Sequence, residues 1–388
     1  MIYLDNNAST KLDPLVLEAA GEAAALYANP SSIHAEGRRA RRAVEEAREE
    51  VARLAGGGAG EVFFTSGGTE ANAMAVFGAT DGRPGRIVRS GAEHPSVREA
   101  VDRLGPASTV DPDPSGRLEP SRLAAAALGG DVVLVTVMAA SNEYGALFPI
   151  AEIARAVRES APGAILHTDA VQAAGRVPLA FGAWGVDLMS LSAHKMHGPK
   201  GAGALVIRKG VRLAVRTAGG GQEKRLRAGT ENTPALVGFG VAARLARERL
   251  EGDAARMTLL RDRLERGIVA AVPDAFVLAR EVPRLPNTSA IRFANASAEM
   301  VLIRLDLEGI AASAGSACSS GTLAPSPAIL SLGLGKEEAG EVVRFSLSRL
   351  TTAEEVDAVV AAVPEIVRSV RAAQAPRRAT AEAEGALR

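Results

Sequence analysis

The sequence has no net charge, few aromatic side chains and a single cysteine. Lysine plus arginine and aspartate plus glutamate each number 45 among 388 residues, so no overall basic field would attract nucleic acid. Aromatic residues make up 3% of the chain, too few for stacking along a nucleic-acid strand. The longest apolar run, residues 132–140, is far shorter than the ~20 residues of a membrane-spanning helix. We therefore expect neither nucleic acid nor a membrane among the partners.

Cysteine usage predicts a reducing compartment and one candidate nucleophile. The lone Cys318 excludes an internal disulfide framework and a zinc cluster of cysteines. It stands in a stretch of small, mostly polar residues, 315–321, whereas a cysteine that fills a core is expected among apolar neighbours. The N-terminus has no basic region followed by an apolar core, so no signal peptide is predicted. We predict a cytoplasmic protein with a reactive thiol at Cys318.

Apolar, β-branched runs alternate with helical patterns through the first half of the chain. Asp13 followed by Pro14 predicts a capped helix start, and apolar residues three and four apart predict a helix over 36–55. Strands are predicted over 62–65, 132–137, 164–168, 186–192 and 204–207, with another from residue 87, and helices over 70–77 and 150–159. This order predicts a doubly wound α/β domain with a mostly parallel sheet between helices.

The pattern changes after Gly219–Gly221. A long helix over 236–266 is predicted to cross to a smaller α+β part with strands at 289–293 and 342–347. Thr352-Ala-Glu-Glu355 is a capping box that opens the last helix.

These changes of pattern predict the domain organisation. We expect a large domain over residues 14–250, and a small α+β domain made of residues 1–13 and 251–371. Residues 372–388 are rich in alanine, glutamate, arginine and proline without periodicity, so they are expected to form a flexible tail.

Polar clusters follow the predicted strands. The clusters are Thr65–Thr69, Glu93–His94, Ser141–Glu143, Asp169–Gln172 and Ser192–Lys195. Ligands of open α/β sheets bind beyond the carboxyl ends of the strands. Clusters at one edge of one sheet therefore predict a ligand site there.

The residue types in these clusters match pyridoxal phosphate. Lys195 follows a buried strand, so its pKa is expected to fall, and a neutral amine can form a Schiff base. Gly68 and Thr69 open a helix, where backbone N–H groups and the hydroxyl can bind a phosphate. Asp169 can hold a proton on a pyridine nitrogen, and His94 can stack on a flat ring. Each feature alone has an ordinary structural explanation, such as a surface lysine or a helix cap, but together they meet that cofactor's requirements.

A metal site is the alternative for the two nearby histidines. His194 and His197 lie three residues apart, but no acidic third ligand is near and Cys318 is distant in the sequence. No metal site is predicted.

The motifs together resemble the cysteine desulfurases of the iron–sulfur-cluster assembly and nitrogenase-associated type, within the class V aminotransferase family. The resemblance runs from Tyr3 to Asp357. Its motifs are Asn29–His34, Thr65–Glu70, His167–Gln172, His194–Lys195 with Gly198–Gly201, Gly229–Asn232, Gly315–Gly321 and Arg344–Arg349. The resemblance implies the type I fold of pyridoxal-phosphate enzymes.

The resemblance also implies a role for each site residue. Lys195 would carry the cofactor, Asp169 would face the ring nitrogen, His94 would stack on the ring and serve catalysis, and Gln172 would contact the ring hydroxyl. The phosphate shell would consist of Gly68, Thr69, Ser192 and His194. Thr230 would reach the phosphate from the other subunit, which implies a homodimer.

Asn142 and Arg344 would bind the substrate carboxylate, a task that suits the fork of a guanidinium. The implied activity is removal of sulfur from L-cysteine, giving L-alanine and a persulfide on Cys318. The sulfur would then pass to an acceptor such as an iron–sulfur scaffold protein.

Other functions remain open at this point. A selenocysteine lyase or another class V enzyme would share the cofactor site, although a transaminase has no use for Cys318. A non-catalytic scaffold is a further alternative, against which the retained lysine, acid and thiol argue. The family usually has glycine where Arg225 stands, often glycine at Ser348, and glutamine rather than Phe148. None of these departures removes a catalytic group.

Overall fold

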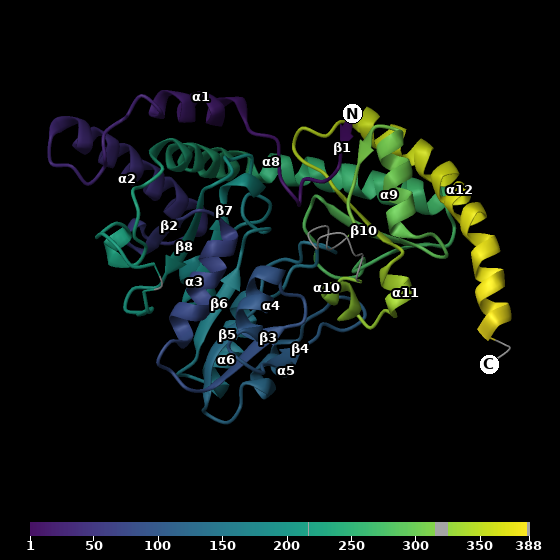
Figure 1. Cartoon of the computed structure of the whole chain (residues 1–388), viewed down its shortest axis with the longest axis horizontal. Helices are drawn as coiled ribbons and strands as arrows, with labels where there is room; N and C mark the ends of the chain where they lie inside the picture. The colour runs from purple at the N-terminus through teal and green to yellow at the C-terminus, as the bar shows by residue number, and fades with distance from the viewer. Residues whose placement is uncertain (216, 315–324, 386–388) are drawn as a thin grey trace.

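The computed structural model describes residues 1–215, 217–314 and 325–385, with side chains up to residue 374. A seven-stranded sheet forms its largest part (Figure 1). In spatial order its strands are β2 (Val62–Thr65), β8 (Gly203–Ile207), β7 (Leu188–Ser192), β6 (Ile165–Asp169), β5 (Val132–Thr136), β3 (Arg86–Ser90) and β4 (Ser108–Val110). β8 runs antiparallel to both neighbours, and the strands from β7 to β4 are parallel. The predicted mostly parallel α/β sheet is confirmed.

Helices pack against this sheet and against one another. They are α1 (Pro14–Ala23), α2 (Ala35–Ala55), α3 (Gly68–Thr80), α4 (Pro95–Asp102), α5 (Pro120–Ala126), α6 (Ile150–Ser160) and α7 (Phe181–Trp184). α3 lies against β5, β6, β7 and β8, while α1 and α2 pack on the long helix α8 (Thr233–Ala271). Every residue of β5, β6 and β7 is buried except the partly exposed Ile165, because helices cover both faces of a parallel sheet.

A second, smaller sheet belongs to the C-terminal part of the chain. Its antiparallel strands are β9 (Ala275–Val277), β10 (Thr288–Phe293) and β12 (Val342–Ser346), in the order β12-β10-β9. Beside it, β1 (Ile2–Tyr3) pairs in parallel with β11 (Ile310–Ala311). The other elements here are α9 (Ala298–Leu307), α10 (Pro327–Leu330), α11 (Lys336–Ala339) and α12 (Ala353–Gly385).

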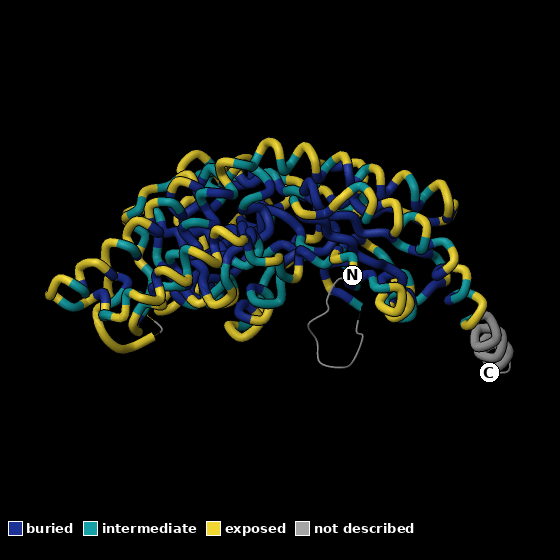
Figure 2. The backbone as a smooth tube through the Cα atoms, turned by 90° about the horizontal axis from the view of Figure 1, so that it is seen from above, coloured by how far each residue is buried: buried dark blue, intermediate teal, exposed yellow. Residues whose placement is uncertain are grey.

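Helix α8 passes from the large sheet to the small one (Figure 1). Its first half contributes Phe239 and Leu245 to the core around the large sheet. Its second half contributes Leu264 and Ile268 to a separate core that also contains Leu4, from the N-terminus. Buried segments fill the middle of each part and exposed ones line the rim (Figure 2). The domain limit predicted at residue 250 lies between these two groups, although the division into domains stays a prediction.

Capping residues explain where two of the helices begin. The Asp13 carboxylate accepts a hydrogen bond from the Leu15 backbone N–H and caps α1, as predicted. At the start of α12, the Thr352 N–H donates to Glu355 and the Glu355 N–H donates to Thr352, which confirms the capping box.

Helix α12 extends into the segment 372–388, whose flexibility stays a prediction. α12 continues to Gly385, so most of the segment 372–388 is helical. Its alanine, glutamate and arginine residues have high helix propensity and sustain a helix without an apolar face. No helix within the described residues is both long enough and apolar enough to span a membrane.

Candidate active site

A cavity of about 260 Å³ lies where the strands of the large sheet end. It brings together most of the predicted site residues: Gly68, Thr69, His94, Asn142, Asp169, Gln172, Ser192, His194 and Lys195. These residues lie at or after the ends of five separate strands, and they meet because parallel strands present their carboxyl ends at the same edge. The cavity at the sheet edge is therefore the one that the polar clusters predict.

Lys195 ends a short 3-10 turn that directly follows β7. Its Nζ donates hydrogen bonds to the backbone carbonyls of Asn7, at 2.5 Å, and Ala8, at 2.8 Å. Burial, with a contribution from the nearby cations Arg176 and Arg344, lowers the pKa of this amine to about 8. The lysine thus combines a fixed position with a larger neutral fraction near pH 7 than an exposed lysine has.

Asp169 is the last residue of β6 and points its carboxylate into the same cavity. One carboxylate oxygen accepts from the Asn72 side chain at 2.7 Å, and the other accepts from the Val171 N–H at 2.9 Å. Asn72 is a site residue that the sequence analysis missed. It lies on α3 three residues after Thr69, and this helical spacing from the phosphate motif was the available signal.

His94 caps helix α4 and lines the cavity. Its Nδ1 accepts a hydrogen bond from the Ser96 N–H at 3.1 Å. Burial lowers the pKa of the imidazole; the Lys195 and Arg98 charges also lower it, while the Asp169 charge raises it. The ring is therefore neutral near pH 7, with its proton on Nε2. Stacking of this ring on a cofactor stays a prediction.

Glu93, the neighbour of His94, lies beneath the cavity and not in its lining. Burial, together with the nearby Asp169 charge, raises the pKa of this carboxyl to about 7. It accepts hydrogen bonds from the Ser90 hydroxyl and from the N–H of Met138, which lines the cavity. Glu93 thus supports the cavity wall.

The helix start at Gly68 forms a tight cradle. A Cβ atom added to Gly68 would lie 2.8 Å from Val171 Cγ2 and 3.5 Å from Ser192 Cβ, so only glycine fits without a shift. The Ser192 hydroxyl is buried and has no hydrogen-bond partner in the described part of the chain. His194 lies beside it in the lining, and burial lowers the pKa of its imidazole to about 4. An orphaned hydroxyl beside the N-terminus of α3 is what a bound phosphate would satisfy.

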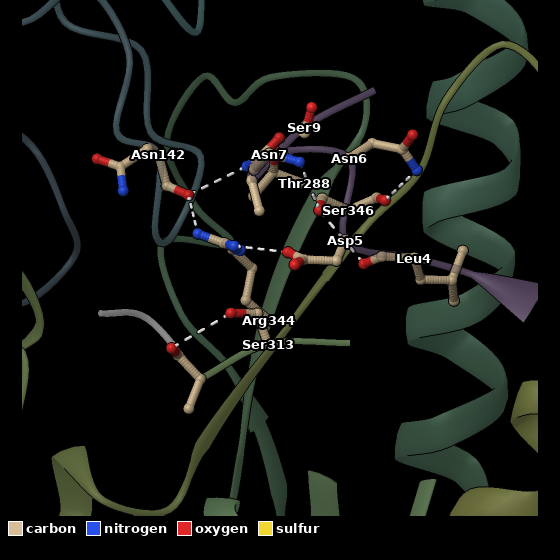
Figure 3. Close-up of polar contacts among 12 residues, drawn as sticks. Leu4, Asp5, Asn6, Asn7, Ser9, Asn142, Thr288, Ser313, Arg344 and Ser346 are labelled. Atoms are coloured by element: carbon tan, nitrogen blue, oxygen red, sulfur yellow. Dashed lines mark hydrogen bonds and ion pairs between the residues drawn. The ribbon is translucent and has the colours of Figure 1, made fainter. Parts of the chain in front are cut away.

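Gln172 and Asn142 complete the lining that was predicted. Gln172 donates from Nε2 to the Asn7 carbonyl at 2.9 Å. The backbone carbonyl of Asn142 accepts a hydrogen bond from Arg344 Nη1 at 2.9 Å. Arg344 itself is buried just outside the lining and also forms an ion pair with Asp5 at 2.8 Å (Figure 3). The N-terminal segment that supplies Asp5, Asn7 and Ala8 was not expected to reach the site.

Two predicted residues are not placed at the cavity. Thr230 is exposed and does not line it. Cys318 lies outside the described residues, as does the whole segment 315–321. Their roles stay predictions.

The positions that depart from the family pattern lie away from the cavity. Phe148 is part of the large core, and Ser348 is buried beside α8. Arg225 has a φ of 68°, a left-handed conformation that glycine adopts without strain, which accounts for glycine being usual there.

Three features of the cavity fit the three parts of pyridoxal phosphate. The Lys195 amine suits its aldehyde, the Asp169 carboxylate suits its ring nitrogen, and the cradle at Gly68 suits its phosphate. The fold and the cavity therefore define a pyridoxal-phosphate-dependent enzyme. Residues 2–359 match the family model described as aminotransferase class-V, and the chain belongs to this family.

Relatives of this chain match it over nearly their whole length. A cysteine desulfurase of Trichormus azollae is 43% identical over 379 residues, covering 96% of this chain and 94% of the relative. The cysteine desulfurase NifS of Azotobacter vinelandii is 42% identical, covering 95% and 93%. The solved structure of a NifS-like protein from Rickettsia africae has a TM-score of 0.87 at 33% identity, covering 94% of this chain and 99% of that one. A structure titled SspA in complex with cysteine has a TM-score of 0.79 at 29% identity, covering 91% and 100%.

Proposed function

We propose that this protein is a cysteine desulfurase that converts L-cysteine to L-alanine and passes the sulfur to an acceptor through a persulfide on Cys318. The observation that carries the proposal is the buried Lys195 amine, which lies in one cavity with the Asp169 carboxylate and the phosphate cradle. Relatives named cysteine desulfurases, which match at 42–43% identity, support cysteine as the substrate.

Pyridoxal phosphate, when bound, supplies the electron sink that makes bonds to the substrate carbon atoms easier to break. Asp169 would hold the proton on the ring nitrogen, and Gly68, Thr69, Ser192 and His194 would hold the phosphate. Lys195 Nζ would take the proton from the substrate Cα, because the lowered pKa leaves it partly neutral near pH 7.

Arg344 and Asn142 would orient the substrate by its carboxylate. The Cys318 thiolate would attack the substrate sulfur, so that an S–S bond forms while the Cβ–S bond breaks. The electron pair of the broken bond stays with Cβ, which takes up a proton and becomes a methyl group. Lys195 would then return a proton to Cα, which completes L-alanine. Overall, one cysteine and one thiol are converted to one alanine and one persulfide, and no external oxidant is needed. The thiol must be reduced to act, which fits the cytoplasmic location predicted from the cysteine content.

The test compares the natural chain with Cys318→Ala, both loaded with cofactor and given L-cysteine. We expect the natural chain to form alanine and to carry one added sulfur atom on Cys318 in peptide mass spectrometry. Cys318→Ala should keep the cofactor's absorbance but lose persulfide and sulfur transfer. Undiminished sulfide release by the variant would refute the nucleophile, and keto-acid formation from cysteine would indicate a transaminase. A higher kcat/KM for L-selenocysteine would indicate a selenocysteine lyase.

We also propose a homodimer in which Thr230 completes the phosphate shell of the partner subunit. Thr230 is exposed in the single chain, and it follows a loop that Arg227 ties to Glu70, next to the cradle, at 2.8 Å. Mixing an inactive Lys195→Ala chain with an inactive Thr230→Ala chain tests this. Shared sites require that the mixture recovers part of the activity, whereas independent sites leave it inactive.

A further inference from the structure

Arg344 is fixed in place by its backbone. It is the middle residue of β12, paired with Ala290 of β10 on one side. On the other side its N–H donates to the Ser313 carbonyl at 2.6 Å, and its carbonyl accepts from the Ser313 N–H at 3.1 Å. Its side chain is 4% exposed. The backbone of Arg344 is therefore held on both sides, and its guanidinium is buried.

The donors of this guanidinium are only partly used. Nη1 donates to the Asn142 carbonyl at 2.9 Å, and Nη2 donates to Asp5 Oδ1 at 2.8 Å. Nε is buried and has no partner in the described part of the chain. A guanidinium holds a carboxylate best through two parallel N–H···O bonds, yet Asp5 makes a single one. The arrangement leaves a buried donor that a better-placed carboxylate would satisfy.

Asp5 differs from Arg344 in its freedom to move. Its backbone lies beside Ser346, but its carboxylate is 20% exposed and can regain water when it leaves the guanidinium. Figure 3 shows the carboxylate beside Arg344, between the N-terminal segment and β12. The more exposed partner of this ion pair is thus the one that a competing carboxylate would displace.

The ion pair is also connected to the cavity. The Asn142 carbonyl that accepts from Arg344 accepts as well from the Asn7 side chain at 3.1 Å. The Asn7 carbonyl in turn holds Lys195 Nζ. The Asp5 and Arg344 charges both act on the pKa of Lys195, the first raising it and the second lowering it. A carboxylate that replaced Asp5 would thus arrive next to the catalytic amine.

We propose that Asp5 is an internal carboxylate that occupies Arg344 until a substrate carboxylate displaces it, and that it thereby sets the affinity for substrate. This inference rests on the proposed function, in which Arg344 binds the substrate carboxylate. Asp5 acts through Arg344, so it is a specificity-determining residue and takes no part in bond breaking. A ligand must outcompete it, and the apparent affinity is reduced by the fraction of molecules in which Arg344 is occupied.

If Asp5 only oriented Arg344 for the substrate, removing the Asp5 carboxylate would weaken ligand binding, whereas our proposal predicts that its removal tightens binding. The probe is L-alanine, which has the amino and carboxylate groups of the substrate but no sulfur. Its dissociation constant is measured by calorimetric titration of the cofactor-free and the cofactor-loaded protein. For Asp5→Asn we expect L-alanine to bind roughly five- to tenfold more tightly, as it would if Asp5 occupied Arg344 in about four-fifths to nine-tenths of molecules. Unchanged or weaker binding would overturn the proposal.

The matched control is Asp274→Asn, which removes an exposed carboxylate from its ion pair with Arg371 in the small-sheet part of the chain. It should leave L-alanine binding unchanged. Asp5→Ser serves as a second variant should Asp5→Asn fold poorly, as thermal unfolding would show, and it should tighten binding in the same way. In steady-state kinetics with L-cysteine, Asp5→Asn should lower KM.

A third variant separates this inference from the proposed function. Arg344→Gln should lose L-alanine binding. If Arg344→Gln binds L-alanine as the natural chain does, the carboxylate role of Arg344 is wrong and the Asp5 proposal falls with it. If Arg344→Gln loses binding but Asp5→Asn does not gain it, the proposed function stands and the Asp5 proposal alone is refuted.

Discussion

The pKa of Lys195 can be measured directly. The structure predicts its value and the direction in which two substitutions should shift it. Burial lowers the pKa of the amine to about 8, with a smaller contribution from neighbouring cations. At pH 7 an amine with a pKa of about 8 is roughly one-tenth neutral, whereas one at the ordinary ~10.4 is neutral in roughly 0.04% of molecules. The site thus raises the reactive fraction by a factor of about 250.

The assay is a short pulse of an amine-reactive reagent on the cofactor-free chain, followed by peptide mass spectrometry. The labelling rate of Lys195 should rise tenfold per pH unit and level off above a pH of about 8, because only the neutral amine reacts. Lys336, an exposed lysine at the start of α11, provides the reference peptide in the same sample. The midpoint of the curve reports the pKa, so limited access of the reagent to the cavity changes the amplitude and not the conclusion.

Two substitutions should move this midpoint in opposite directions. Arg176→Met removes a buried cation and should raise the pKa of Lys195, whereas Asp169→Asn removes an anion and should lower it. A labelling rate that keeps rising through pH 10 in the natural chain would refute the reasoning. So would movement of the two midpoints in the same direction.

Two further predictions concern cofactor binding and stability. Gly68→Ala places a Cβ 2.8 Å from Val171 Cγ2, so we expect a loss of about 1–3 kcal/mol of stability and weaker cofactor binding, measured by unfolding and by absorbance titration. Glu223→Ala removes the partner of the buried Arg48, which it holds at 2.7 and 2.8 Å, and should cost about 3–5 kcal/mol in the free energy of unfolding. Glu45→Ala removes an exposed partner of the same arginine and should cost less than about 1 kcal/mol. Equal losses for the two glutamates would contradict the role assigned to burial.

Much of the site could be predicted because its signals are local. A polar residue that directly follows a buried strand must lie at the sheet edge, and this places His94, Asn142, Asp169 and Lys195 around one cavity. The signals for helix starts also lie in neighbouring residues, as the cap at Asp13 shows.

Contacts between distant segments could not be predicted in this way. Asn72 approaches Asp169 across 97 residues of sequence, and Asn7 approaches Lys195 across 188. Neither pairing has a periodicity or a motif of its own, because each depends on how whole elements pack. Gln172, which the resemblance assigned to the ring hydroxyl, also donates to the Asn7 carbonyl for the same reason.

The sequence by itself determined the α/β order of elements, the strand-end clusters and the cofactor that their chemistry requires. Those properties follow from residue type and spacing, which are present in the unfolded chain. Only the tertiary structure decided that Asp5 lies against Arg344 and that the Asn7 carbonyl lies against Lys195. Such contacts arise when packed elements bring charges and carbonyls within hydrogen-bonding distance, so they depend on the fold as a whole.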